Sequence, residues 1–256
     1  MTITDDKGFA TVLAVRGDYA DAISVADRVS SMPGYVPEGG ARNIARRDGM
    51  GTVMLDGTVA MGRLPDHYFQ AVGSGTGGIA AWEASMRLIE DGRYGGTLPR
   101  LELAQNEPFV PMAKAWNARR REITAEDLGD GMDVFEVYAD VLTNRRPPYS
   151  MAGGVFDAMS ATDGRFRTVT NTEARSAEKL WNSIEASSPN PAASVALASL
   201  IKAVDDGSVD PDSCILLNMT GGGIERSMED FDMSRIAPKA VLDPDASEEE
   251  IAEVLA

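Results

Sequence analysis

The sequence contains 256 residues, of which 43% are hydrophobic and 6% aromatic, so the chain is long and apolar enough to bury a large core. Its 24 lysine and arginine residues against 40 aspartate and glutamate residues give a formal net charge of -16. That charge argues against a nucleic-acid partner and against binding to an anionic membrane surface; acidity of this kind usually serves solubility.

The sequence offers few residues for metal or nucleophilic chemistry. The one cysteine, Cys214, lies in an apolar run and is interpreted as a small buried hydrophobe, so we expect no disulfide within the chain and no zinc site. The one histidine, His67, begins another apolar run, where a structural role is the favoured interpretation. The first residues lack the basic flank and apolar core of a signal peptide, and no run approaches the ~20 apolar residues of a membrane helix. We therefore predict a cytoplasmic protein without a metal or membrane site.

The first predicted elements are a buried strand over residues 9–15 and a helix over residues 19–30. Asp18 is placed to cap that helix, whose apolar residues recur at helical spacing. The two elements form a βα unit for which the preceding sequence supplies no partner strand.

A connection rich in glycine and proline follows and carries the most basic patch of the sequence. Arg42, Arg46 and Arg47 could hold an anionic substrate, but a solvated helix face paired with nearby acids is the favoured interpretation. Asn43 stands at a helix-capping position.

The central stretch covers residues 67–90, HYFQAVGSGTGGIAAWEASMRLIE, and its pattern predicts a strand, a glycine-rich turn and a helix from Ile79. Glycines let the backbone approach a ligand closely, and a helix start presents unpaired N–H groups and the positive end of the helix dipole. Ser74 and Thr76 add hydroxyl donors. The turn therefore predicts a phosphate site, with a turn that only lets the helix pack closely on the strand as the alternative.

The glycine spacing Gly73-x-Gly75-x-x-Gly78 also satisfies a dinucleotide-binding fingerprint. That fingerprint requires an acidic residue at the end of the next strand. The next predicted strand, residues 101–104, is followed by Gln105 and Asn106 instead. The acid of a dinucleotide site is therefore missing.

Helices and short strands alternate through the rest of the chain. Helices are predicted over residues 111–121, 153–159, 172–184 and 191–204, strands over 166–169 and 214–218, a surface insertion over 123–132, and an acidic tail with a loose helix over 243–256. The strand at 214–218 is interpreted as central and buried, and it runs into a second glycine-rich turn, residues 219–223. We expect both glycine turns at the carboxyl edge of one sheet, where open α/β folds bind ligands.

Six segments of the sequence, in order and spacing, resemble the cysteate synthases of methanogenic archaea: VPEGGARN, RRDGMGTVMLD, PDHYFQAVGSGTGGIAAWEAS, NEPFVPM, VLTNRRPPYS and LLNMTGGG. These are fold-type II pyridoxal-phosphate enzymes related to threonine synthase. The resemblance implies an α/β fold with a large cofactor domain, built on an open, mainly parallel sheet with helices on both faces, plus a remnant of the small domain. It also implies pyridoxal 5'-phosphate as the cofactor, and O-phospho-L-serine and sulfite as the substrates from which L-cysteate is made for coenzyme M biosynthesis.

The resemblance also assigns cofactor-binding residues. The family's phosphate-binding loop falls on Gly73, Ser74, Gly75, Thr76, Gly77 and Gly78, and the residue that faces the pyridine nitrogen falls on Thr220. A neutral hydroxyl shares a hydrogen bond with that nitrogen without forcing it to be protonated, which suits β-elimination and replacement.

One departure from the family concerns the lysine that forms its Schiff base with the cofactor. The lysines present are Lys7, Lys114, Lys179, Lys202 and Lys239, and none lies in a segment that resembles the family's lysine motif or its asparagine-containing loop. We therefore expect the C-terminal part of the enzyme, with residues 1–45 as the small-domain remnant and residues 46–256 as the large domain. No catalytic residue is assigned, and the chain alone is expected to be inactive. We expect it to act as a homo-oligomer once an N-terminal half, either encoded separately or cut off where the start of the sequence was assigned, completes it.

Two other functions stay open at this point. The first is a non-catalytic fragment or subunit that binds a phosphate-bearing ligand through Gly73–Gly78. The second keeps the fold but exchanges the reaction for one of the threonine-synthase type, which the residues present do not distinguish.

Overall fold

The computed structural model describes residues 10–129, 131–185, 187–222, 224–230 and 236–255. The chain divides into two compact units: residues 39–222, and residues 1–38 together with 223–256. The tail thus groups with the N-terminal segment, whereas the sequence-based division placed it with residues 46–222. The assignment of residues 1–45 and 46–256 to a small and a large domain stays a prediction.

The larger unit is built on a four-stranded parallel sheet with the order β4-β3-β2-β5. The strands are β2 (His67–Ala71), β3 (Arg100–Asn106), β4 (Arg165–Val169) and β5 (Ile215–Leu217). The predicted open parallel sheet is confirmed. The prediction that the last strand is central and buried is wrong, because β5 is an edge strand and its residues, like Cys214 before it, are only half-buried.

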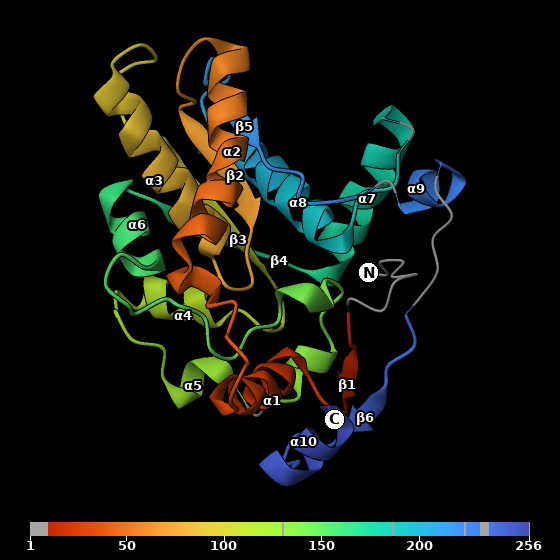
Figure 1. The fold of residues 1–256 in the computed structure, drawn as a ribbon. Helices are drawn as coiled ribbons and strands as arrows, with labels where there is room; N and C mark the ends of the chain where they lie inside the picture. The colour runs from red at the N-terminus through yellow and green to blue at the C-terminus, as the bar shows by residue number, and fades with distance from the viewer. Residues whose placement is uncertain (1–9, 130, 186, 223, 231–235, 256) are drawn as a thin grey trace. The chain divides into compact units, whose positions relative to one another are not determined.

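Helices cover both faces of this sheet, as expected for the α/β class (Figure 1). One face carries α2 (Ile44–Met61), α3 (Thr76–Asp91), α4 (Pro111–Asn117) and α6 (Val155–Ala161), and the other carries α7 (Asn171–Glu185) and α8 (Pro191–Asp205). Successive strand residues point to opposite faces. Tyr68 accordingly packs in the core under α2 and α3, and Phe69 packs beside Ala203 of α8.

The connections of the larger unit contain short helices: α5 (Ala125–Leu128), η1 (Gly40–Arg42), η2 (Asp133–Phe135) and η3 (Asp140–Leu142). The predicted surface insertion over residues 123–132 agrees with the structure, since most of its described residues are exposed; the exception is one residue of α5. Its Asp127 has a side chain that is only 4% exposed and accepts hydrogen bonds from Arg120 at 2.6 and 2.9 Å. This ion pair holds α5 against the residues that follow α4.

The smaller unit contains a two-stranded parallel sheet, β1 (Leu13–Val15) with β6 (Ala240–Leu242), and the helices α1 (Tyr19–Ser31), α9 (Ile224–Asp230) and α10 (Glu248–Leu255). The predicted cap of α1 by Asp18 is confirmed. Strand β1 covers only Leu13–Val15 of the strand predicted over residues 9–15, and residue 9 lies outside the described residues. Its partner β6, which the sequence analysis did not anticipate, comes from the opposite end of the chain.

Candidate functional site

The glycine-rich turn predicted between a strand and a helix lies between β2 and α3. Helix α3 begins at Thr76 rather than at Ile79, so the predicted start was wrong by three residues and the second half of the turn is the first helical turn. Gly75 is the residue before the helix, with φ of 78°, a left-handed conformation that glycine adopts without strain. The chain can therefore reverse sharply and enter the helix within two residues.

The start of α3 leaves donors available at the turn. Helix α3 has no side-chain cap; the hydroxyls of Ser74 and Thr76 bond to each other at 3.0 Å. Within the described residues, no acceptor pairs with the N–H groups of Gly77 and Gly78, although both residues are buried. Buried N–H groups require a partner, and a helix N-terminus favours an anionic one. The residues present therefore fit a phosphate group.

Close packing explains the same glycines. A Cβ on Gly73 would lie 2.9 Å from the carbonyl oxygen of Leu142, and one on Gly78 would lie 2.9 Å from the Leu103 side chain. The Cβ positions of Gly75 and Gly77 are filled by Val155 and by the Gln70 amide in the same way. Close packing thus accounts for these glycines, as the packing alternative expects, and the phosphate site stays a prediction. Close packing at the Cβ positions is compatible with phosphate binding, because phosphate binding depends on the backbone N–H groups of Gly77 and Gly78.

The second glycine turn begins directly after β5. The N–H of Gly221 bonds to the carbonyl of Met219 at 2.9 Å, which makes Thr220 the apex of a tight turn. The carbonyl of Gly221 accepts a bond of 3.0 Å from the N–H of Asn190, the cap of α8. Thr220 is exposed, and no hydrogen bond joins its hydroxyl to another residue in the described part of the chain. Among the described residues, none therefore competes with a ligand for this hydroxyl.

The two turns follow neighbouring strands. Strands β2 and β5 are parallel and paired, with Phe69 opposite Leu217, and the N–H of Asn218 extends the ladder by bonding to the carbonyl of Phe69 at 2.9 Å. Parallel neighbours have their carboxyl ends at the same edge of the sheet. The expectation that the two glycine turns share this edge is confirmed.

Two asparagines fix the rest of the carboxyl edge. The Asn106 amide, at the end of β3, donates to the carbonyl of Val169 at 2.8 Å and to Asn171 at 3.1 Å, and its oxygen accepts from the N–H of Ala139 at 2.9 Å. Asn171 accepts from the N–H of Tyr138 at 2.8 Å. In place of the acid of a dinucleotide site, β3 thus ends in an amide whose contacts hold the segment around Ala139 against the edge.

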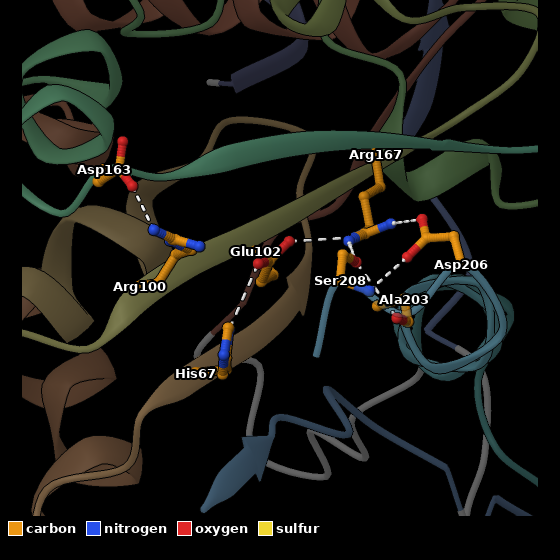
Figure 2. Close-up of polar contacts among 8 residues, drawn as sticks. All are labelled: His67, Arg100, Glu102, Asp163, Arg167, Ala203, Asp206 and Ser208. Atoms are coloured by element: carbon orange, nitrogen blue, oxygen red, sulfur yellow. Dashed lines mark hydrogen bonds and ion pairs between the residues drawn. The ribbon is translucent and has the colours of Figure 1, made fainter. Parts of the chain in front are cut away.

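A network of charged side chains around the buried Glu102 lies away from this edge, on the α8 face (Figure 2). Glu102 of β3 is fully buried; its carboxylate contacts Arg167 Nε at 3.0 Å and His67 Nδ1 at 3.3 Å, the latter without hydrogen-bond geometry. Arg167 also forms an ion pair with Asp206 at 2.9 Å and donates a hydrogen bond to the hydroxyl of Ser208. His67 is the first residue of β2, at the opposite end from the glycine turn, so the network lies apart from both turns and supports the predicted structural role of the histidine.

The remaining cations are mostly paired or exposed. Lys114 donates to the carbonyl of Asp127 at 3.4 Å, and Lys202 pairs with Glu173 at 2.7 Å. Arg47 pairs with Glu83 at 3.0 Å, as the predicted pairing with acids requires, but its side chain is only 18% exposed and not solvated; Arg42 and Arg46 are exposed near the start of α2. Asn43 caps α2 as predicted, accepting from the N–H of Arg46 at 3.2 Å. The described residues contain no group of three or more potential metal ligands and no helix with the length and apolar character to cross a bilayer.

This arrangement is that of an open α/β protein with a phosphate-type turn at its carboxyl edge. Residues 6–221 match the family described as pyridoxal-phosphate dependent enzyme, so the chain belongs to that family, whose cofactor is pyridoxal phosphate. Among curated relatives, it is similar to the cysteate synthase of Methanospirillum hungatei, with 53% identity over 94% of this chain and 57% of that protein. It is also 56% identical to the cysteate synthase of Methanosarcina barkeri over 91% of this chain and 57% of that protein. The chain thus spans little more than half the length of these relatives.

Solved structures agree on the fold. Maize serine racemase superposes with a TM-score of 0.61 at 15% identity, covering 84% of this chain and 62% of that chain. A threonine deaminase from T.th. superposes with a TM-score of 0.51 at 20% identity, covering 82% of this chain and 73% of that chain. These similarities confirm the fold-type II α/β class and carry no information on the substrate.

Proposed function

We propose that the chain is the larger part of a cysteate synthase, which converts O-phospho-L-serine and sulfite to L-cysteate and phosphate for coenzyme M biosynthesis. The observation that carries this proposal is the identity of 53% to 56% with proteins of that name over about nine-tenths of the chain. In the reaction a C–O bond to phosphate breaks and a C–S bond to the sulfur of sulfite forms at the same carbon. The completed enzyme is proposed to be a homo-oligomer.

The proposed cofactor site consists of the two turns at the carboxyl edge. Bound pyridoxal phosphate supplies an electron-withdrawing ring that assists bond cleavage at the β-carbon of an amino acid. The N–H groups of Gly77 and Gly78, with the hydroxyls of Ser74 and Thr76, would hold its phosphate. The Thr220 hydroxyl would accept or donate a hydrogen bond at the ring nitrogen, and Gly73 and Gly75, whose Cβ positions are occupied by Leu142 and Val155, would complete the phosphate loop.

The Schiff-base lysine of such an enzyme is proposed to lie in the part of the relatives that this chain does not match. Lys114 and Lys202 are held by Asp127 and Glu173 on the two helical layers. Neither lysine lies in one of the two glycine turns, which supports the proposal that the Schiff-base lysine comes from outside this chain. Arg42 and Arg46, both exposed, are the residues to test first for the substrate's phosphate and for sulfite.

A chimera tests the assignment. This chain replaces the matching 57% of the Methanosarcina barkeri relative, and the product is assayed with O-phospho-L-serine and sulfite, sulfide or water. We expect cysteate from sulfite, with loss of product when Thr220 is changed to alanine. Turnover with sulfide or water but not with sulfite would refute the substrate assignment.

The alternative of a non-catalytic phosphate-binding subunit makes a different prediction in the same experiment. An inactive chimera that is still stabilised against heat by inorganic phosphate would favour that alternative, because a ligand that binds only the folded state raises its stability. An active chimera would exclude it.

A further inference from the structure

The two proposed cofactor turns are linked beneath the surface by two hydrogen bonds and one close packing contact. The Asn218 amide, two residues before Thr220, donates to the Tyr68 hydroxyl at 2.8 Å. Tyr68 in turn donates to the Gln70 side-chain oxygen at 2.9 Å. The Gln70 amide lies directly against the backbone of Gly77, where a Cβ on that glycine would meet it. The path therefore runs from the start of one turn to the first helical turn of the other.

The central residue of this path has no access to water. Tyr68 is 1% exposed and Gln70 is 5% exposed, and both lie on the same face of β2 because they are two residues apart. Burial raises the pKa of Tyr68 far above its usual value, against a smaller opposing contribution from Asn218, so the hydroxyl stays protonated and keeps donating to Gln70. A buried phenol with both a donor and an acceptor partner is a rigid spacer rather than a titrating group.

Two backbone hydrogen bonds also fix the second turn. The ladder bond from the N–H of Asn218 to the carbonyl of Phe69 sets the height of the second turn along the strand, and the bond from Asn190 to Gly221 holds its far end. Neither reaches the glycine turn. The backbone ladder of β2 and β5 sets the distance between the strands that lead into the two turns, and the Asn218–Tyr68–Gln70 path adds a side-chain link between the turns that a single substitution can remove.

We propose that Tyr68 is a positioning residue that holds the Thr220 turn at a fixed distance from the glycine turn, so that one cofactor can bind to both. This inference rests on the proposed cofactor site. It assigns no contact between Tyr68 and the cofactor itself. Its consequence is that removing one buried hydroxyl should weaken binding of a ligand that spans both turns while sparing a ligand that uses only one.

The chain offers a matched control. Tyr149 is also fully buried, and its hydroxyl donates a hydrogen bond of 3.0 Å, but to the backbone carbonyl of Arg120. Burial raises the pKa of Tyr149 to about 12, so this phenol too stays protonated. Tyr68→Phe and Tyr149→Phe therefore remove the same atom from equally buried rings, and only the first cuts the path between the turns.

The experiment measures binding of pyridoxal phosphate and of inorganic phosphate to the full chain and to both variants, together with amide hydrogen exchange of residues 73–80 and 215–222 without ligand. We expect Tyr68→Phe to weaken pyridoxal phosphate binding about tenfold, the equivalent of one good hydrogen bond, while inorganic phosphate binds within about twofold of the unaltered chain. Exchange should rise in both segments. Tyr149→Phe should change neither binding constant and neither segment.

A second variant guards against a folding defect. Asn218→Ala cuts the same path at its half-buried end, and in combination with Tyr68→Phe it should add little further loss of affinity, because the two residues act through one path. Equal binding by the unaltered chain and Tyr68→Phe, or additive losses in the double variant, would overturn the positioning role while leaving the cofactor site intact. Failure of the unaltered chain to bind either ligand would instead overturn the cofactor site and, with it, this inference.

Discussion

The carboxyl edge of the sheet and the charge network on its α8 face use polar groups in opposite ways. At the edge, the N–H groups of Gly77 and Gly78 and the hydroxyl of Thr220 are left without partners among the described residues. In the network, the fully buried Glu102 is paired with Arg167, whose side chain is 11% exposed. Charges removed from water must be paired, whereas a site for an anion can be built from neutral donors. The difference separates the part that stabilises the fold from the part suited to a ligand.

The largest expected effect comes from breaking the charge network. Arg167→Met leaves the Glu102 carboxylate fully buried with only His67 nearby, and such changes cost about 3 to 5 kcal/mol. Urea unfolding at pH 7 measures the loss. The control, Arg93→Met, removes an exposed ion pair with Asp91 and should have little effect. Equal losses in the two variants would show that the network contributes no more than a surface pair.

A smaller effect is expected from filling the glycine turn. Gly75→Ala introduces a Cβ at φ of 78° and against the Val155 side chain. We expect a loss of about 3 kcal/mol in the free energy of unfolding, from left-handed strain and overpacking together. Gly62→Ala, at φ of 70° with no atom within 4 Å of its Cβ, should lose only about 1 kcal/mol. If the two variants lose the same amount, close packing is not what shapes the turn.

The smallest effect is expected at the exposed end of the charge network. The Ser208 side chain, and after it Arg167, lower the pKa of Asp206 to about 2. Because the pKa is lower in the folded state, the ionised Asp206 stabilises the fold fully above about pH 4, and this stabilisation is lost as the pH falls through about 2. Because the Asp206 side chain is 53% exposed, we expect Asp206→Asn to cost only about 0.5 kcal/mol at pH 7. A cost that is unchanged at pH 2 would contradict this assignment, as unfolding measurements at the two pH values would show.

The sequence was sufficient to predict the parts of the fold that depend on local pattern. The strand, glycine turn and helix at residues 67–90 and the second glycine turn after β5 follow from periodicity and glycine content. Their meeting at one edge follows from the parallel sheet. The start of α3 at Thr76 was missed because Gly77 and Gly78 were interpreted as loop residues, although glycine also adopts helical angles.

Contacts between distant segments could not be predicted in this way. The pairing of β1 with β6 joins the two ends of the chain, and no local pattern specifies it. Glu102 and Arg167 are of types usually found in solvent, so their burial depends on the register of β3 and β4. The polar Tyr68 and Gln70 on one face of a buried strand were a sign that a buried hydrogen-bond path lies there, but Asn218 as their partner requires the pairing of β2 with β5.

The central claim, that the glycine turn binds the cofactor through its phosphate, is tested most directly by comparing pyridoxal phosphate with pyridoxal. Thermal unfolding of the full chain is followed in the presence of each compound and of inorganic phosphate. We expect pyridoxal phosphate and phosphate to raise the unfolding temperature and pyridoxal to leave it unchanged, with a stabilisation of about 2.7 kcal/mol when the ligand is at 100 times its dissociation constant. Equal stabilisation by pyridoxal and pyridoxal phosphate, or none by any of the three, would contradict the assignment of this turn.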